Sequence, residues 1–104
     1  MSSYEEQCRA DARLAILAEL AQQTDATLNS RNIARMIETI VPRRPIEWVE
    51  AQIAWLAEMG AVTALRSDLP GLGTVMIATI TRFGRDHVEL RSLIPGVSRP
   101  ADGA

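Results

Sequence analysis

The chain has 104 residues, 47% of them hydrophobic, and a formal net charge of −2, which together indicate one soluble globular domain. No apolar run reaches the roughly 20 residues that cross a bilayer, the acidic N-terminus lacks the apolar segment of a secretory signal, and a lone cysteine forms no internal disulfide. All eleven basic residues are arginine, and residues 30–99 carry nine of them against seven acids, so any contact with nucleic acid would be local.

Two helices are predicted in the first part of the chain. The first runs from Tyr4 to Gln22, where strong helix formers surround apolar residues at helical spacing. The second begins near Asn29 and Ser30, both favourable N-caps. It ends at Val41–Pro42, because the residue before a proline avoids the helical region.

A third helix is expected to open at Pro45, since proline is favoured at the first helical position. The apolar side chains that follow have the spacing of an amphipathic helix and are Ile46, Val49, Ile53 and Leu56. Gly60 is the expected left-handed stop. Only Val41–Arg44 would connect the second and third helices, and two short helices joined so tightly are typical of a helix-turn-helix.

The pattern changes after Gly60. Residues 61–66 and 74–81 have the β-branched, alternating character of strands, and residues 67–73 are rich in turn formers, which predicts a β-hairpin with a loop of about seven residues. A last short helix is expected from Thr81 or Arg82, with Gly84 weakening its start. The order helix, helix, helix, hairpin, helix predicts a mainly α, α+β domain of the winged helix-turn-helix type over residues 1–92, followed by a C-terminal tail over residues 93–104.

A resemblance to known families supports this fold. The stretch Ile46–Val62 resembles the third helix of winged-helix regulators, which ends in a leucine, a glycine and then a valine that starts the wing. Residues 78–85 resemble the step by which such domains leave the wing. More narrowly, Arg85–Glu89 followed by Ile94–Pro100 resembles the small ArsR-like winged-helix proteins of Mu-like transposable phages and prophages. The winged-helix resemblance covers about residues 10–92. Together the two resemblances imply a cytoplasmic transcriptional regulator of a bacterial host cell, acting as a homodimer.

In such an architecture the third helix enters the major groove of double-stranded DNA. Trp48 and Gln52 are expected on its outward face, where Gln52 could pair with adenine and Trp48 could pack on a sugar or a thymine methyl. The arginines would contact phosphates. The complete set of predicted DNA-binding residues is Arg31, Arg35, Arg43, Arg44, Trp48, Gln52 and Arg66.

An alternative function remains open at this point. The third helix carries Glu47, Glu50 and Glu58 and no positive charge, and phosphates repel carboxylates. The alternative is a winged-helix protein-interaction module without DNA binding, with Trp48 on its docking surface. Trp55 would either join that surface or close the core against the wing.

No catalytic, cofactor or metal site is predicted. Cys8 and His87 lie at opposite ends of the chain and belong to no cluster of the kind that ArsR-like metal sensors require. Nothing supplies the orienting group of a cysteine–histidine pair. The glycines in Pro70–Gly73 lack the Gly-Lys-Ser/Thr of a phosphate loop. We therefore expect a protein that is not an enzyme and takes no cofactor, no metal and no membrane partner.

Overall fold

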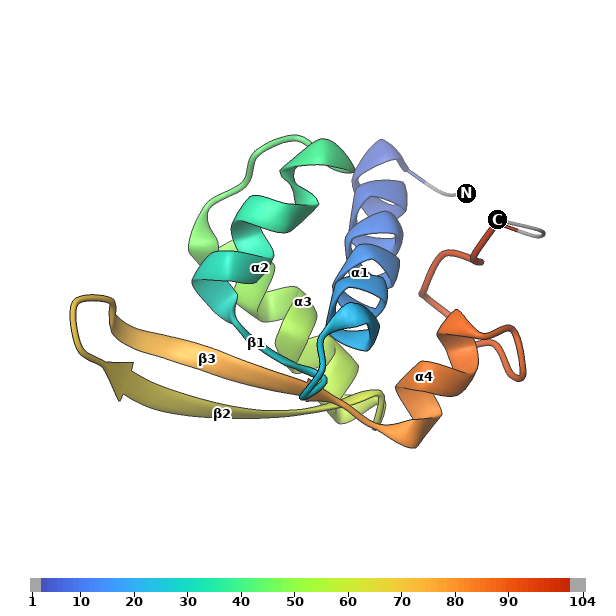
Figure 1. The fold of residues 1–104 in the computed structure, drawn as a ribbon. Coiled ribbons are helices and arrows are strands. Elements are labelled where there is room, and N and C mark those ends of the chain that lie inside the picture. Colours follow the sequence, from blue (N-terminus) through green and yellow to red (C-terminus); the bar gives the residue numbers. More distant parts are fainter. Residues whose placement is uncertain (1–2, 102–104) are drawn as a thin grey trace.

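The computed structural model describes residues 3–101 and has an α+β fold (Figure 1). The elements in chain order are α1 Tyr4–Gln22, β1 Thr27–Asn29, α2 Ser30–Met36, the 3-10 turn η1 Ile37–Thr39, α3 Ile46–Glu58, β2 Val62–Leu69, β3 Gly73–Ile80 and α4 Arg82–Val88. The three strands form an antiparallel sheet in the order β1-β3-β2. Within residues 3–101, no helix combines the length and apolar character that crossing a membrane requires.

Local capping explains where the helices begin and end. The Ser3 hydroxyl accepts a hydrogen bond from the Glu6 N–H at 3.0 Å, and α1 has the bounds predicted for it. The Asn29 side chain caps α2 by accepting from the Asn32 N–H at 3.0 Å. Gly60 follows α3 with φ +84°, the left-handed conformation in which glycine is favoured. These three predictions are confirmed.

The connection between the second and third helices differs in detail from the prediction. Regular α-helix ends at Met36, and the chain continues as the tighter turn η1 before Val41, whose N–H donates to the Ile37 carbonyl at 3.0 Å. Pro45 is the N-cap of α3 rather than its first residue, and its carbonyl accepts from the Trp48 N–H at 3.0 Å. The two helices are still joined by a short segment, residues 40–45.

The strand β1 was not predicted. It pairs with β3 in a register that runs from Thr27 opposite Thr79 to Asn29 opposite Ile77. Three residues are too few to display an alternating pattern, and their partner is about fifty positions away in the chain. A pairing of this kind is decided by the tertiary structure, so the predicted two-stranded hairpin is part of a three-stranded sheet.

The predicted seven-residue hairpin loop is wrong. The strands continue until Leu69 stands opposite Gly73, which leaves only residues 70–72 in the turn. Ser67 and Asp68 are turn formers by type, but they pair with Val75 and Thr74, and the Thr74 hydroxyl donates to the Asp68 carboxylate. The hydrogen-bonded ladder thus extends into residues whose intrinsic preference is for turns, because strand preference depends strongly on context.

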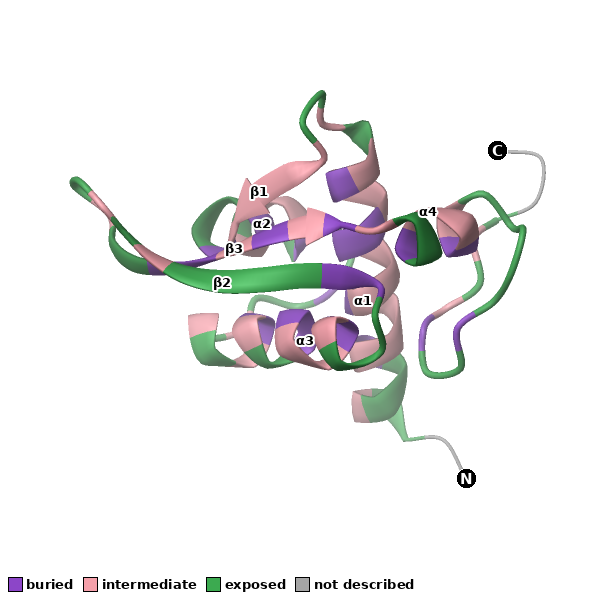
Figure 2. Cartoon of the chain, turned by 90° about the horizontal axis from the view of Figure 1, so that it is seen from below, coloured by how far each residue is buried: buried purple, intermediate pink, exposed green. Residues whose placement is uncertain are grey.

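The core lies between the helices and β3. In Figure 1, α1 stands between α2 on one side and α4 on the other. Figure 2 shows that β2 is largely exposed beyond its first residue, whereas β3 carries most of the buried strand positions. The largest fully buried aliphatic side chains, from α1, α2, η1, α3, β3 and the C-terminal segment, are Ile16, Leu17, Leu20, Ile33, Ile37, Val49, Ile53, Leu56, Val75 and Ile94.

The segment that was predicted as a tail from residue 93 onward packs onto α1 as far as Ser98. The Ser98 N–H donates to the Ala10 carbonyl at 3.2 Å, and Ile94 and Val97 are buried in the core. His87, fully buried, holds the segment at both ends: its Nδ1 accepts from the Ile94 N–H, and its Nε2 donates to the Ser98 carbonyl, each at 2.9 Å. This pair of bonds requires the neutral imidazole with its proton on Nε2. Residues 102–104 of the predicted tail lie outside the described residues.

Candidate nucleic-acid interface

Four of the predicted DNA-binding residues converge on one pocket. Arg31 and Arg35 lie one turn apart on α2 and therefore share a face. Arg43 and Arg44 come from the segment that precedes α3. Together with Ala34, Glu38 and Ile46, these four arginines line a pocket of about 230 Å³, which we call the arginine pocket.

The guanidinium groups of the arginine pocket differ in how far their charge is compensated. Arg31 and Arg35 are exposed, and neither has a carboxylate oxygen within 4.0 Å among residues 3–101. Arg43 is exposed as well, with its Nε 3.8 Å from a Glu38 oxygen. An exposed ion pair at this distance contributes little stability, so these three charges are available to an anion.

Arg44 is already paired with the carboxylate of Glu5. Its guanidinium contacts both oxygens of Glu5, at 2.9 and 3.0 Å, and lies over the Trp48 ring with its Cζ 4.7 Å from the centroid. The Trp48 indole N–H donates to the same carboxylate at 2.9 Å. Hydrogen bonds from Arg44 and then from Trp48 lower the pKa of Glu5, and Glu5 in turn raises the pKa of Arg44. Arg44 and half-buried Trp48 therefore tie the first turn of α1 to the start of α3.

The prediction that Gln52 faces outward is wrong. Only 3% of Gln52 is exposed, because its side chain points from α3 toward α1. Its Oε1 accepts from the Arg13 Nε at 3.0 Å, and its Nε2 donates to the Trp48 carbonyl at 3.2 Å. The contact between α1 and α3 is thus wider than the apolar stripe of α3, and it includes a polar pair. Sequence reasoning missed Glu5 and Arg13, since nothing in their spacing signals a partner on another helix.

The exposed face of α3 carries no positive charge. Its exposed residues are Glu47, Ala51 and Glu58. Two carboxylates on this face would approach the phosphates of a duplex if α3 lay in the major groove, and that approach is electrostatically unfavourable. The exposed face of α3, the helix expected to read DNA, is therefore poorly suited to lie against phosphates.

Arg66 lies on β2 beside the start of α2. Its side chain is 58% exposed and its Nη2 is 3.4 Å from the Glu50 Oε1. The other Glu50 oxygen accepts from the hydroxyl of Ser30, the first residue of α2. Glu50 therefore links Arg66 to the first residue of α2, but Arg66 does not line the arginine pocket.

The other residues that the sequence analysis singled out are Trp55, Cys8 and His87, and all three pack within the fold. Trp55 is half-buried and packs against the core; its ring lies under the Arg13 guanidinium, 3.8 Å from the ring centroid, and beside Gly96. Cys8 and His87 are both buried. Within residues 3–101, no three His, Cys, Asp or Glu side chains are grouped so that they could hold one metal ion.

Comparison with known proteins finds no match for this chain among protein-family models, curated proteins or solved structures.

Proposed function

We propose that this protein is a winged helix-turn-helix protein without catalytic activity that binds double-stranded DNA as a phage or prophage regulator. The order of its helices and strands, and the short segment between α2 and α3, support the winged-helix assignment. Arg31, Arg35 and Arg43 contact the phosphate backbone, and Arg66 adds a contact from the hairpin. The outward face of α3 stays away from the phosphates.

The arginine pocket is the observation that carries this proposal. Arg31 and Arg35 are like charges one turn apart, an arrangement that costs stability in a helix. A phosphate between them and Arg43 would convert that repulsion into charge-assisted hydrogen bonds. Guanidinium groups are suited to this contact because their planar fork matches two phosphate oxygens at once.

Binding through a few phosphates has a measurable salt dependence. Each neutralised phosphate contributes about 0.9 to the slope of log affinity against log salt, so four contacts predict a slope of about 3.6 and roughly 150-fold weaker binding at 200 mM than at 50 mM salt. We propose to measure the anisotropy of a labelled mixed-sequence duplex over this range with the full chain. Absence of binding at 50 mM salt would exclude the proposal.

Arginine substitutions test whether the arginine pocket makes the contacts with the duplex phosphates. The triple substitution Arg31→Gln, Arg35→Gln and Arg43→Gln is expected to lower the slope by about 3 and so to remove most of the salt dependence. Arg82→Gln is the matched control, because Arg82 is an exposed arginine on α4, on the opposite side of α1 from α2 (Figure 1). An equal loss in the control and the triple variant would mean that binding follows net charge alone.

A second candidate function is that of a protein-interaction module. It is favoured by the exposed face of α3, which carries two carboxylates and no positive charge. In this case the docking surface is formed by Glu47, Ala51 and Glu58. An Ala51→Arg substitution would then abolish association with a protein partner, while the triple arginine variant would retain it. The opposite result, with partner association lost only in the triple variant, would rule this candidate out.

A further inference from the structure

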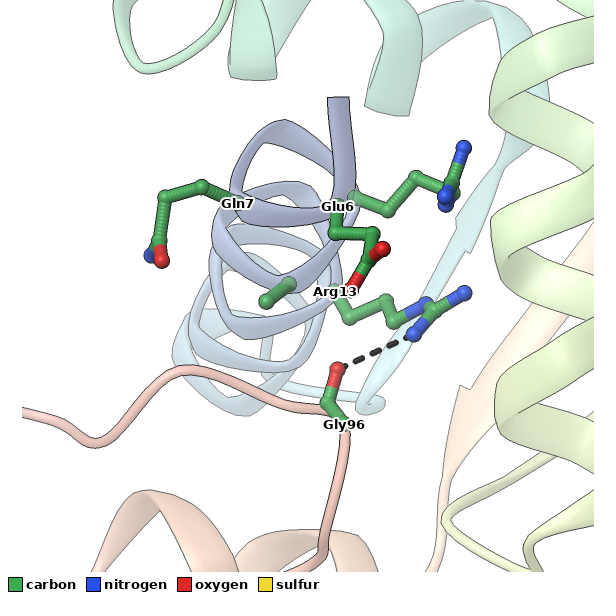
Figure 3. A pocket seen from close by; sticks show the side chains of 6 residues that line it. Glu6, Gln7, Arg13 and Gly96 are labelled. Carbon is green, nitrogen blue, oxygen red and sulfur yellow. Dashed lines mark hydrogen bonds between the residues drawn. The ribbon is translucent and has the colours of Figure 1, made fainter. Parts of the chain in front are cut away.

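A second pocket lies between α1 and the C-terminal segment. It has a volume of about 440 Å³ and is lined by Glu6, Gln7, Arg9, Ala10, Arg13 and Gly96, and we call it the α1 pocket. In Figure 3, Glu6 and Arg13 extend to the same side of α1, Gln7 leaves the helix on another side, and a dashed line joins Arg13 to Gly96. The volume falls within the range of pockets that bind small molecules.

The guanidinium of Arg13 is hydrogen-bonded only to uncharged groups within residues 3–101. Its Nε donates to the Gln52 Oε1 and its Nη1 to the Gly96 carbonyl, both at 3.0 Å, and the guanidinium stacks on the Trp55 ring. No carboxylate oxygen lies within 4.0 Å of it among residues 3–101. Burial and the nearby charge of Arg9 both lower the pKa of Arg13. A partly buried charge of this kind is normally paired with an opposite charge.

The surrounding residues keep this guanidinium in place and leave part of it open to the pocket. Gly96 has φ +91°, and a Cβ at this position would lie 2.7 Å from Cζ2 of Trp55 and 3.4 Å from the Arg13 Nη1. The Nη2 of Arg13 donates to no group in residues 3–101. Arg9, one turn earlier on α1, has only a 3.5 Å contact with Glu5 at the surface.

We propose that the α1 pocket binds a small oxyanion, either a carboxylate or a phosphate. Arg13 and Arg9 donate hydrogen bonds to its oxygens, and the planar guanidinium of Arg13 is held ready by Gln52, Gly96 and Trp55. The carboxylate of Glu6 lines the same pocket and repels the ligand. This site is separate from the arginine pocket and does not depend on DNA binding.

The test is a nuclear magnetic resonance titration of the full chain. Sodium succinate and inorganic phosphate serve as separate probes, and sodium chloride of equal ionic strength is the reference. Saturable shifts of the Arg13 side-chain Nε–H and of the Gly96 amide with either probe support the proposal and identify the chemistry of the ligand. The side-chain resonances of Arg31 and Arg35 report separately on the arginine pocket.

Two variants make the test specific, and both change side chains whose contacts with the rest of the fold are few. Arg9→Gln removes one donor and is expected to weaken binding at least about tenfold, since a hydrogen bond to a charged group is lost. Glu6→Gln removes the like charge and is expected to tighten binding. The control Arg82→Gln leaves it unchanged. Shifts that sodium chloride reproduces, or an affinity that Arg9→Gln does not alter, would overturn the proposal.

Discussion

Replacing Ser30 by alanine tests the joint between the helices and the sheet. The Ser30 hydroxyl is fully buried, accepts from the Met76 N–H at 3.0 Å and donates to the Glu50 Oε2 at 3.0 Å. On β3 the Ile80 N–H donates to the Ala26 carbonyl. Hydrogen-bonded positions alternate in an antiparallel ladder, so Met76 would face the carbonyl of residue 30 if β1 continued. The chain turns into α2 there, and the side chain replaces that carbonyl.

The magnitude follows from what each partner loses. In Ser30→Ala, the Met76 N–H is left in a buried position without an acceptor, which costs about 1–3 kcal/mol. Glu50 loses less, because it keeps its contact with Arg66. We expect the free energy of unfolding to fall by about 2 kcal/mol, which corresponds to about 10 °C in Tm for a domain of this size.

Urea denaturation at pH 7 measures this loss, and hydrogen exchange of the Met76 amide identifies its cause. The amide is expected to be protected in the parent protein and to exchange faster in Ser30→Ala. Ser92→Ala is the control, since Ser92 is exposed and its hydroxyl bonds to no group in residues 3–101, so its free energy of unfolding should change by less than about 0.5 kcal/mol. A Ser30→Ala variant as stable as the control, with Met76 still protected, would refute this reasoning.

Three further predictions concern Gly84, Glu5 and Glu47. Gly84→Ala would place a Cβ 2.2 Å from the Ala61 carbonyl oxygen, so urea denaturation should show a loss of about 3 kcal/mol; a loss below about 1 kcal/mol would contradict this contact. The Arg44 hydrogen bond lowers the pKa of Glu5 below its ordinary 4.5, so ionised Glu5 stabilises the fold above that pH and this contribution disappears as the pH falls through the lowered value. Glu5→Gln should therefore narrow the difference between the urea midpoints at pH 6 and pH 3, and an unchanged difference would argue against the pair. Glu47→Gln should alter duplex affinity in the anisotropy assay less than about twofold, whereas a large gain would mean that α3 faces the phosphates.

Much of the secondary structure could be predicted because its causes are local. The N-caps Ser3 and Asn29 and the left-handed Gly60 act on neighbouring backbone groups, so the bounds of α1 and the start of α2 follow from residue type and spacing. The hairpin was recognised but its loop was overestimated. Ser67 and Asp68 prefer turns as isolated residues, and only the ladder with β3 makes them strand residues.

The candidate site was predictable in part for a related reason. Arg31 and Arg35 share a face because helical spacing requires it, and a short connection brings Arg43 near them. Gln52 was misplaced because its neighbour is not on its own helix: Arg13 of α1 crosses to it. Helical periodicity places a residue on one side of its helix and contains no information about a polar partner on another helix.

The amino-acid sequence by itself determined the bounds of α1, the start of α2 and the left-handed stop at Gly60. It also determined that a hairpin follows α3 and that nine arginines lie in residues 30–99. Only the tertiary structure decided that residues 27–29 form a third strand and that His87 holds residues 94–98 against the core. It also decided that Arg44 forms an ion pair with Glu5, whereas Arg13 is hydrogen-bonded to neutral groups. The first group depends on interactions within a few residues. The second depends on side chains that meet across long stretches of chain, whose positions exist only once the core has assembled.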